Sequence, residues 1–235
     1  MPASPSEQNA PTAQTVDAAR QRLDAVQAEI ARACADARRD PDEVTLIAIS
    51  KTQDAEAIGP LIAAGQRVFG ENRVQEAQGK WPELRAAQGD IALHMVGQLQ
   101  SNKALDAVTL FDYIHSLDRL SLVAALASAM DKADRRIPCF VQVSLAGEEQ
   151  KGGCTVGDLP GLLDAARAAD VPVIGLMTVP PLDLEPAPWF ALLAKIADDY
   201  GLTGLSMGMS GDYGKAVRIG ATHVRIGSAL FGARG

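Results

Sequence analysis

The sequence predicts an α/β fold, a single (β/α)8 TIM barrel with one extra helix at its N-terminus. From residue 45 onward, short apolar runs rich in β-branched residues alternate with longer stretches of helical periodicity, which is typical of βα units around a parallel sheet. Eight such units in about 190 residues fit a compact barrel. A doubly wound sheet would show the same alternation, but it does not need eight units, and its glycine-rich fingerprint is missing after the first strand.

The segment before the first strand is predicted to form an amphipathic helix. Apolar residues recur at helical spacing between Val16 and Arg38, among them Leu23, Val26 and Ile30. The polar residues 1–14 include several prolines and lack this pattern, so they are expected to be disordered. Residues 15–235 should then form one domain, because no low-complexity linker divides them.

The strands and helices of the barrel follow from the same change of period. Strands are expected at Thr45–Ser50, Arg67–Phe69, Ile91–Val96, Phe111–His115, Cys139–Leu145, Val173–Met177, Gly204–Met207 and His223–Ile226. Helices are expected at Ala55–Ala64, Asn72–Lys80, Ser101–Ala107, Arg119–Lys132, Gly157–Ala168, Ala187–Tyr200, Tyr213–Ile219 and Ser228–Phe231. Because a helix follows every strand, the strands should run parallel.

Composition narrows the class of protein. A formal net charge of -7, a pI near 5.0 and the lack of a basic stripe argue against a nucleic-acid or membrane partner. No apolar run reaches the roughly 18 residues of a membrane span, and the N-terminus has no signal-peptide pattern. Cys34, Cys139 and Cys154 have neither zinc-site spacing nor the even count of a disulfide framework. The chain is therefore expected in the cytoplasm.

In a (β/α)8 barrel, functional residues gather in the loops that follow the strands. Unusual polar segments stand at these positions along the chain. They are Lys51, Gly70–Asn72, His94–Lys103, Ser116, Leu145–Gly153, Met177–Thr178, Gly208–Asp212 and Arg225–Ser228. A functional site is therefore predicted at this rim of the barrel.

Two of these loops are expected to bind a phosphate. The segment SMGMSGDYGKA is a glycine-rich loop that opens a helix, so backbone N–H groups and Ser210 can meet an anion. The segment VRIGSALFG repeats the arrangement, with Gly227 allowing close backbone approach and Ser228 starting a short helix. Barrels often bind phosphate after strands seven and eight. A P-loop is excluded, because Lys215 is followed by Ala216 instead of Ser or Thr.

Lys51 ends the first strand, in the segment TLIAISKT, and its surroundings leave three roles open. Across the barrel mouth from a phosphate site, it is suited to form a Schiff base with a phosphorylated aldehyde. It can equally be a solvated lysine at a strand end. As a third alternative it belongs to a structural ion pair, for which Glu71 is the candidate partner.

The histidines and Arg225 are interpreted differently. His94 lies inside an apolar strand, where a hydrogen-bonded core histidine is a more common role than a catalyst, and the same holds for His115 and His223. Strand alternation points Arg225 toward the barrel mouth and away from the side of its apolar neighbours. A charge at that position requires a partner, so Arg225 is a candidate site residue.

Together these segments resemble the YggS/PROSC family of pyridoxal phosphate homeostasis proteins, which share the barrel of the alanine racemase N-terminal domain. The resemblance is carried by AISKT, FGENRVQE, GQLQSNK, GEEQKGG, GLMTVPP, SMGMSGDY and VRIGSALFG, in this order. One such segment would be weak support, whereas seven at successive strand ends are specific. Arg73 stands where the family often has an aromatic residue, and Ser144 where asparagine is common.

The resemblance implies a site for pyridoxal 5'-phosphate (PLP) and assigns its anchoring residues. Lys51 would form the internal aldimine with the cofactor. Ser210 and the backbone of Gly227 and Ser228 would bind its phosphate.

The same resemblance assigns the residues around the pyridine ring. Met177 would pack against the ring and Asn72 would lie close to it, while Arg225 would face the pyridine nitrogen. Because an arginine has a very high pKa, it keeps that nitrogen unprotonated and weakens the cofactor as an electron sink. Such a site is better suited to holding PLP than to demanding carbanion chemistry.

The function implied is PLP binding for intracellular PLP (vitamin B6) homeostasis, in which the protein buffers the cofactor or delivers it to PLP-dependent apoenzymes without robust turnover. The alternative is a PLP-dependent amino-acid racemase, which needs a base on each face of the substrate. In alanine racemases the opposite base is a tyrosine from a second domain at a dimer interface. The chain is expected to lack that domain, since it ends with the eighth unit, and to be a monomer. A third hypothesis is a barrel enzyme with an ordinary phosphorylated substrate and an unmodified Lys51.

Overall fold

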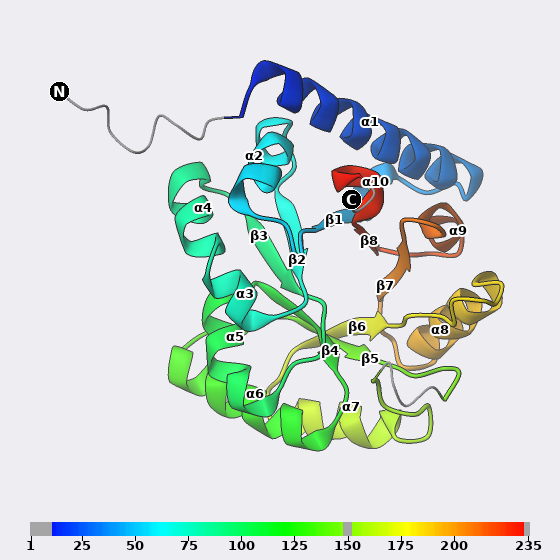
Figure 1. Ribbon diagram of the computed structural model, residues 1–235. Helices are drawn as coiled ribbons and strands as arrows, with labels where there is room; N and C mark the ends of the chain where they lie inside the picture. Colours follow the sequence, from blue (N-terminus) through cyan, green and yellow to red (C-terminus); the bar gives the residue numbers. More distant parts are fainter. Residues whose placement is uncertain (1–10, 148–151, 233–235) are drawn as a thin grey trace.

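The computed structural model describes residues 11–147 and 152–232. Its strands close into a parallel barrel in sequence order (Figure 1). They are β1 (Thr45–Ile49), β2 (Val68–Glu71), β3 (Ala92–Met95), β4 (Tyr113–Leu117), β5 (Cys139–Gln142), β6 (Val173–Met177), β7 (Gly204–Met209) and β8 (His223–Ile226). The barrel closes where β1 pairs with β8, from Thr45 opposite His223 to Ala48 opposite Ile226. The predicted (β/α)8 barrel and the positions of its eight strands are confirmed.

Helices surround the barrel, with one more than the sequence predicted. They are α1 (Ala13–Asp36), α2 (Ala55–Ala63), α3 (Val74–Gln78), α4 (Trp81–Gln88), α5 (Ala104–Leu110), α6 (Leu120–Ala133), α7 (Leu159–Ala168), α8 (Ala187–Asp199), α9 (Tyr213–Arg218) and α10 (Ser228–Phe231), with short 3-10 turns at Pro41–Glu43 and Ser101–Lys103. The helix predicted over Asn72–Lys80 is α3, which is shorter and ends at Gln78, and α4 follows it over residues for which no helix was predicted. Pro82 lies in the first turn of α4, where a proline needs no N–H partner.

The N-terminal helix begins earlier than the apolar pattern predicted. The Thr12 side chain caps α1 by accepting a hydrogen bond from the Thr15 N–H, so the helix starts at Ala13 and not at Val16. Residues 1–10 of the segment that was expected to be disordered lie outside the described residues. None of the helices within residues 11–147 and 152–232 has the length and apolar composition that a membrane crossing requires.

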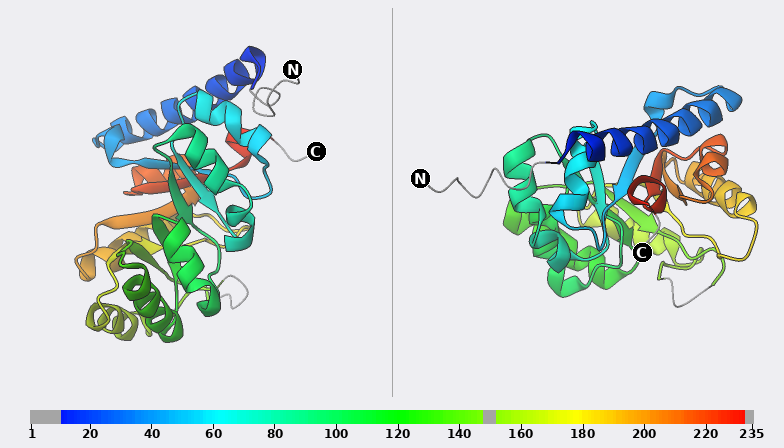
Figure 2. Two further views of the ribbon diagram at one scale, coloured as in Figure 1. Left: turned by 90° about the vertical axis from the view of Figure 1, so that its left-hand side faces the viewer. Right: turned by 45° about the horizontal axis from the view of Figure 1, so that its top comes forward.

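Helix α1 covers the part of the barrel that the last unit leaves open. Helix α10 has four residues, too few to cover β8, and α1 lies across α2, α9 and α10 (Figures 1 and 2). Its apolar face buries Leu23, Val26 and Ile30. Arg22 Nε also donates a 2.7 Å hydrogen bond to the Leu230 carbonyl oxygen. The extra helix therefore completes the outer layer where the chain closes.

The interior of the barrel contains a cluster of aromatic and histidine rings. The rings of His94 and Tyr113 stack with centroids 4.3 Å apart, and those of His115 and Phe140 stack at the same distance. His223 meets Phe140 edge-on at 4.8 Å. His94 Nδ1 lies 2.9 Å from His115 Nε2, and both residues are buried. The interpretation of these two histidines as hydrogen-bonded core residues is confirmed.

This interior position holds the histidines neutral. Burial, and then the neighbouring His223, lowers the pKa of His94 well below 6.5; burial likewise lowers the pKa of His115, helped by the surrounding histidines and Arg225. Burial, with a smaller contribution from Arg225, lowers the pKa of His223 to about 4. Near neutral pH, all three rings are therefore uncharged.

The histidine cluster predicts that the fold weakens in mild acid. An unfolded histidine takes up a proton near pH 6.5 and His223 in the folded chain only near pH 4, so the unfolded chain binds more protons in that window. The contribution of neutral His223 to stability is fully present above pH 6.5. As the pH drops toward 4, the free energy of unfolding falls by at most about 3 kcal/mol from His223 alone. Urea unfolding of wild type and His223→Leu at pH 7 and pH 5 measures this. Equal losses in both proteins would contradict the assignment.

Candidate cofactor site

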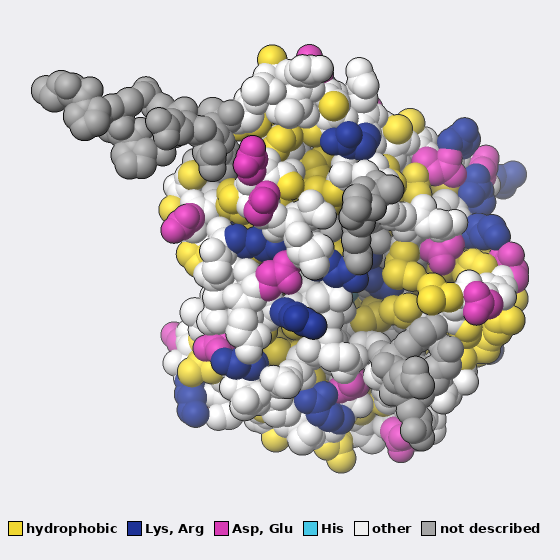
Figure 3. Space-filling view, in the orientation of Figure 1, with side chains coloured by type: hydrophobic (Ala, Val, Ile, Leu, Met, Phe, Trp, Pro, Cys, Tyr) yellow, Lys and Arg dark blue, Asp and Glu magenta, His cyan; other side chains and the backbone are white. Residues whose placement is uncertain are grey.

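A cavity of about 480 Å³ opens at the mouth of the barrel, where β1, β2, β7 and β8 end. Its volume lies in the range of about 300 to 1,000 Å³ that is typical of small-molecule sites. Figure 3 shows Lys and Arg side chains around the hollow near the middle of this face. The cavity brings together six of the seven predicted site residues, which are Lys51, Asn72, Ser210, Arg225, Gly227 and Ser228.

Lys51 follows β1 and its half-buried side chain lines the cavity beside Ile49, Val96 and Phe231. Among the described residues, no carboxylate or carbonyl oxygen accepts a hydrogen bond from Lys51. The ion pair with Glu71 that the sequence left open is not formed, because Glu71 pairs with another lysine. The Lys51 amine therefore belongs to the cavity and not to a structural pair.

Lys80 fixes the backbone on both sides of Lys51. Its Nζ donates 2.8 Å hydrogen bonds to the carbonyl oxygens of Ser50 and Gln53 and lies 2.9 Å from Glu71 Oε1. Glu71 is completely buried, and Ser50 Oγ donates to its Oε1 at 2.6 Å. The Lys80–Glu71 ion pair therefore connects the end of β2 to the loop after β1, and we call it, with the two backbone bonds of Lys80, the clamp. The sequence did not indicate Lys80, because nothing local shows which carbonyl groups its side chain reaches.

The clamp also holds the one strained residue of this loop. Thr52 has a φ of 63°, in the left-handed region that β-branched residues avoid. Its N–H donates to Glu76 Oε1, and Lys80 Nζ lies 3.1 Å from the same oxygen. Loop strain is therefore balanced by a local network that presents Lys51 to the cavity.

The two predicted phosphate loops are joined by a hydrogen bond. The Gly227 N–H donates to Ser210 Oγ at 3.2 Å, which links the loop after β7 to the loop after β8. Gly208 has a φ of 95°, and a Cβ there would lie 2.7 Å from the Ala216 Cβ, so the tight turn requires glycine. Ser228 begins α10, where N–H groups have no acceptor within the helix. The Ser210 hydroxyl hydrogen and these N–H groups can meet one anion.

Arg225 lines the cavity and is held by uncharged groups. Its Nη1 donates to Ser206 Oγ at 2.6 Å and its Nη2 donates to the Thr178 carbonyl oxygen at 2.9 Å. No salt bridge to Arg225 occurs among the described residues. Burial lowers the pKa of Arg225 to about 10, with an opposing effect of Asp212, so it remains a cation near neutral pH. The predicted partner of this charge is thus a set of oxygen dipoles and not a carboxylate.

Neither Met177, which was predicted as a site residue, nor Arg73 lines the cavity. Met177 is buried at the end of β6, and because Leu176 belongs to the core outside the sheet, alternation turns Met177 to the barrel interior. The wall beyond β6 is made by Val179. Arg73 lines a neighbouring groove of about 890 Å³ together with Lys103, and Asn72 is shared by both hollows.

The site uses further residues to which the sequence assigned no role. Thr178, whose carbonyl oxygen holds Arg225, and Met209, which lines the cavity, lie in predicted rim segments. Ser206, which also holds Arg225, and Val179, which lines the cavity, lie outside them. Period-two alternation in β7 could have indicated Ser206, because its neighbours Leu205 and Met207 are apolar core residues and Ser206 must face the other side of the strand. Part of the predicted rim segment Leu145–Gly153 lies outside the described residues.

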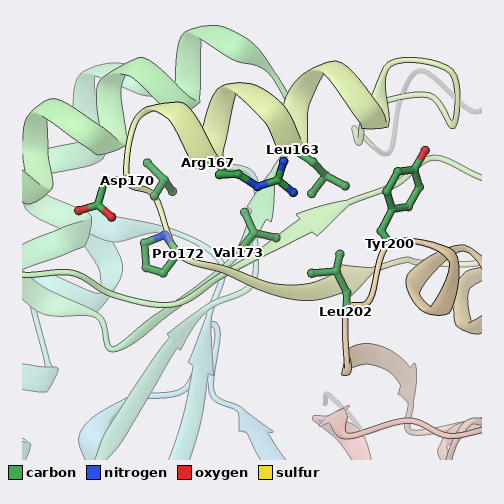
Figure 4. Close-up of a pocket in the computed structure, with 8 residues that line it drawn as sticks. Leu163, Arg167, Asp170, Pro172, Val173, Tyr200 and Leu202 are labelled. Atoms are coloured by element: carbon green, nitrogen blue, oxygen red, sulfur yellow. The ribbon is translucent and has the colours of Figure 1, made fainter.

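A separate notch of about 280 Å³ lies at the opposite end of the barrel, before β6 and β7 (Figure 4). It is lined by Leu163 and Arg167 of α7, by Pro172, and by Tyr200 and Leu202 ahead of β7. None of the predicted site residues lines it. Over the described parts of the chain, no group of three or more His, Cys, Asp or Glu residues is arranged to hold a metal ion.

Comparison with known proteins agrees with this geometry. The family described as "Alanine racemase, N-terminal domain" matches residues 21–235. The pyridoxal phosphate homeostasis protein of Pseudomonas aeruginosa is 41% identical over 217 residues, which cover 89% of this chain and 93% of the relative. That of Escherichia coli K12 is 35% identical over 223 residues, covering 89% and 94%. The chain belongs to this family of pyridoxal phosphate homeostasis proteins. Both of these relatives are named for homeostasis and not for an enzymatic activity.

Solved structures of family members have the same barrel. PipY of Synechococcus elongatus PCC7942 without PLP is 40% identical, with a TM-score of 0.78 over 86% of this chain and 100% of PipY. The PipY structure with PLP bound has a TM-score of 0.74 over the same shares. The alanine racemase of Clostridium difficile 630 is 13% identical with a TM-score of 0.69, over 93% of this chain and 57% of the racemase, and shows the fold alone. The predicted alanine racemase-like barrel is confirmed.

The Lys80–Glu71 pair of the clamp predicts that Lys80→Met destabilises this protein. The methionine keeps the aliphatic stem but leaves the buried Glu71 carboxylate without its cation, and breaking a buried pair costs about 3 to 5 kcal/mol. The control is Lys195→Met, which removes an exposed pair with Asp199 and should leave stability unchanged. Urea unfolding of both variants measures the difference, and equal midpoints would show that the clamp has no such role.

Proposed function

We propose that this chain binds PLP at the mouth of the barrel and takes part in PLP homeostasis by buffering the cofactor or delivering it. The observation that carries the proposal is that the Lys51 amine lines the same cavity as the joined loops of Ser210 and Gly227. An amine and an anion site in one cavity fit a phosphorylated aldehyde. The PLP-bound structure of PipY, 40% identical to this chain, supports the same ligand.

The anchoring residues fit the two ends of PLP. Lys51 would bind the aldehyde carbon covalently as a Schiff base, with release of one water molecule. The Ser210 hydroxyl donates to the phosphate, because its oxygen already accepts the Gly227 N–H. Because the Gly227 N–H is already used by Ser210, the backbone N–H of Ser228 at the start of α10 would complete this phosphate site, and Gly227 would allow the close approach of the backbone.

The residues around the ring favour holding the cofactor over using it. Arg225 remains charged near neutral pH, and as a donor beside the pyridine nitrogen it keeps that nitrogen unprotonated. Without a protonated nitrogen the ring withdraws fewer electrons, which is a poor basis for carbanion chemistry. Asn72 lines the cavity and would lie beside the ring, whereas Met177, which does not line it, is not assigned a contact with the ring.

We further propose PLP-dependent apoenzymes as recipients, a cytoplasmic location and a monomeric state. These proposals rest on the family and on the acidic charge of the chain. Gel filtration coupled to light scattering tests the monomer directly. A PLP-dependent racemase remains the second candidate function, because the same barrel occurs in alanine racemase.

The proposed site predicts that the purified protein binds PLP with the absorption band of a lysine Schiff base and that Lys51→Ala abolishes this band. The control is Lys103→Ala, which removes a lysine of the neighbouring groove that pairs with Asp106 and lies outside the cavity. Borohydride reduction followed by peptide mass spectrometry should find the adduct on Lys51 in the wild type and in the control. A colourless wild type with excess PLP would disprove the proposal.

Turnover assays separate the alternatives. Steady racemisation of L-alanine by the PLP-loaded protein at ordinary enzymatic rates would support the racemase, whereas homeostasis predicts no such turnover. If Lys51→Ala bound a sugar phosphate with unchanged affinity while the wild type failed to take up PLP, the chain would instead be a barrel enzyme with another phosphorylated substrate.

A further inference from the structure

A continuous chain of hydrogen bonds runs from the cavity wall into the barrel interior. Arg225 Nη1 lies 2.6 Å from Ser206 Oγ, Ser206 Oγ lies 2.8 Å from His115 Nδ1, and His115 Nε2 lies 2.9 Å from His94 Nδ1. All four residues are buried, with exposed fractions of 6% for Arg225, 1% for His94 and 0% for the two between them. These residues come from β8, β7, β4 and β3, so the chain crosses the whole interior.

Arg225 fixes the direction of every bond in this chain. A guanidinium has only donors, so Ser206 Oγ accepts from Arg225. Among the described residues the one other partner of this buried hydroxyl is His115 Nδ1, and because a buried hydroxyl hydrogen without an acceptor is costly, that hydrogen is directed at His115 Nδ1. His115 then carries its hydrogen on Nε2 and donates it to His94 Nδ1. Both rings are consequently neutral and protonated on Nε2.

A charged histidine would break the chain. An imidazolium has donors at both nitrogens, so a protonated His94 would turn an N–H toward the N–H of His115. A protonated His115 would leave the Ser206 hydroxyl hydrogen without an acceptor and add a second cation beside Arg225. The lowered pKa values of both histidines agree with the neutral arrangement.

We infer that Ser206 and His115 are positioning residues that set the orientation of Arg225 toward the bound cofactor. This inference rests on the proposed function. Ser206 and the Thr178 carbonyl oxygen use two of the five N–H groups of Arg225, which leaves the others for the cavity. Because the supporting chain is neutral, it orients the guanidinium without cancelling its charge, as a carboxylate would.

The rings of the chain are themselves held in place. His115 stacks on Phe140 and His94 stacks on Tyr113, each with ring centroids 4.3 Å apart. A Cβ at Gly204 would lie 2.8 Å from the Phe140 ring, so this glycine makes room for the stack. Rotation of either histidine would disturb a packed neighbour, and the acceptor for Ser206 is therefore fixed in direction.

Two substitutions at one position separate the hydrogen bond from the packing. His115→Phe keeps a ring against Phe140 but removes the acceptor for Ser206. His115→Asn loses the ring, while its Oδ1 replaces Nδ1 as an acceptor. Circular dichroism and thermal unfolding show that each variant is folded before it is compared.

The first measurement uses the protein without cofactor, so it is independent of the proposed function. Nitrogen-15 NMR at pH 7 should show His94 and His115 protonated on Nε2 alone. The Arg225 side-chain hydrogens should exchange slowly with water in the wild type and in His115→Asn, and faster in His115→Phe. A charged or Nδ1-protonated His115, or exchange that is unchanged in His115→Phe, would overturn the inference.

The second measurement is calorimetric binding of 4'-deoxypyridoxine 5'-phosphate, which keeps the ring and phosphate of PLP but lacks the aldehyde. His115→Phe should weaken binding roughly tenfold, the scale of one hydrogen bond to a charged group, and His115→Asn should restore most of it. In an Arg225→Met background, His115→Phe should have no further effect, because it acts through Arg225. An equal loss in both backgrounds would overturn the positioning role. Absence of binding in the wild type, with the expected NMR result, would refute the cofactor site and leave the hydrogen-bond chain intact.

Discussion

Closure of the barrel between β1 and β8 is the constraint on which the site depends. Lys51 and the Gly227–Ser228 loop stand at opposite ends of the sequence and meet only because these two strands pair, with Ala48 opposite Ile226. The same closure leaves a short final helix, which α1 compensates by packing over it. Pairing of β7 with β8 then brings the Ser210 loop alongside. The fold thus gathers an amine and an anion site that no local stretch of sequence contains.

The interior of this barrel is polar because a cation, Arg225, is buried in its wall. A buried charge without a carboxylate needs aligned dipoles, and Ser206 with the Thr178 carbonyl oxygen supplies them. The hydroxyl in turn needs an acceptor, which brings a histidine into a space that barrels usually fill with branched apolar side chains. Each polar group requires the next one as its hydrogen-bond partner, so the buried Arg225 accounts for the polar residues in the interior below it. The cost appears as the depressed pKa of every histidine in the cluster.

Periodicity was sufficient to predict the barrel, because burial on both faces of a parallel sheet imposes apolar runs and the helices impose a different period. Lys51 could be predicted because it ends an apolar strand, Ser210 because it lies in a glycine-rich loop that opens a helix, and Arg225 because it interrupts the apolar residues of a strand. Helix α4 was missed because Pro82, which usually marks a boundary, here opens a helix. The partners Lys80 and Ser206 were missed for another reason. Their roles depend on contacts across 19 to 30 residues of sequence, and only the assembled fold determines which partner each one meets.

The charge distribution around the cavity favours reversible binding. Among the described residues that line it, the only cations are Lys51 and Arg225, and the proposed roles assign them to the aldehyde and the ring nitrogen. The phosphate is then left to a hydroxyl and backbone N–H groups, which are weaker partners for an anion than charged side chains. In the proposed site, the covalent bond to Lys51 would be reversed by water, or by another amine that takes over the aldehyde. A clamped lysine, an oriented arginine and uncharged phosphate donors would then hold the ligand in a defined geometry while keeping release accessible. These are the properties that the proposed buffering or delivery of a cofactor requires.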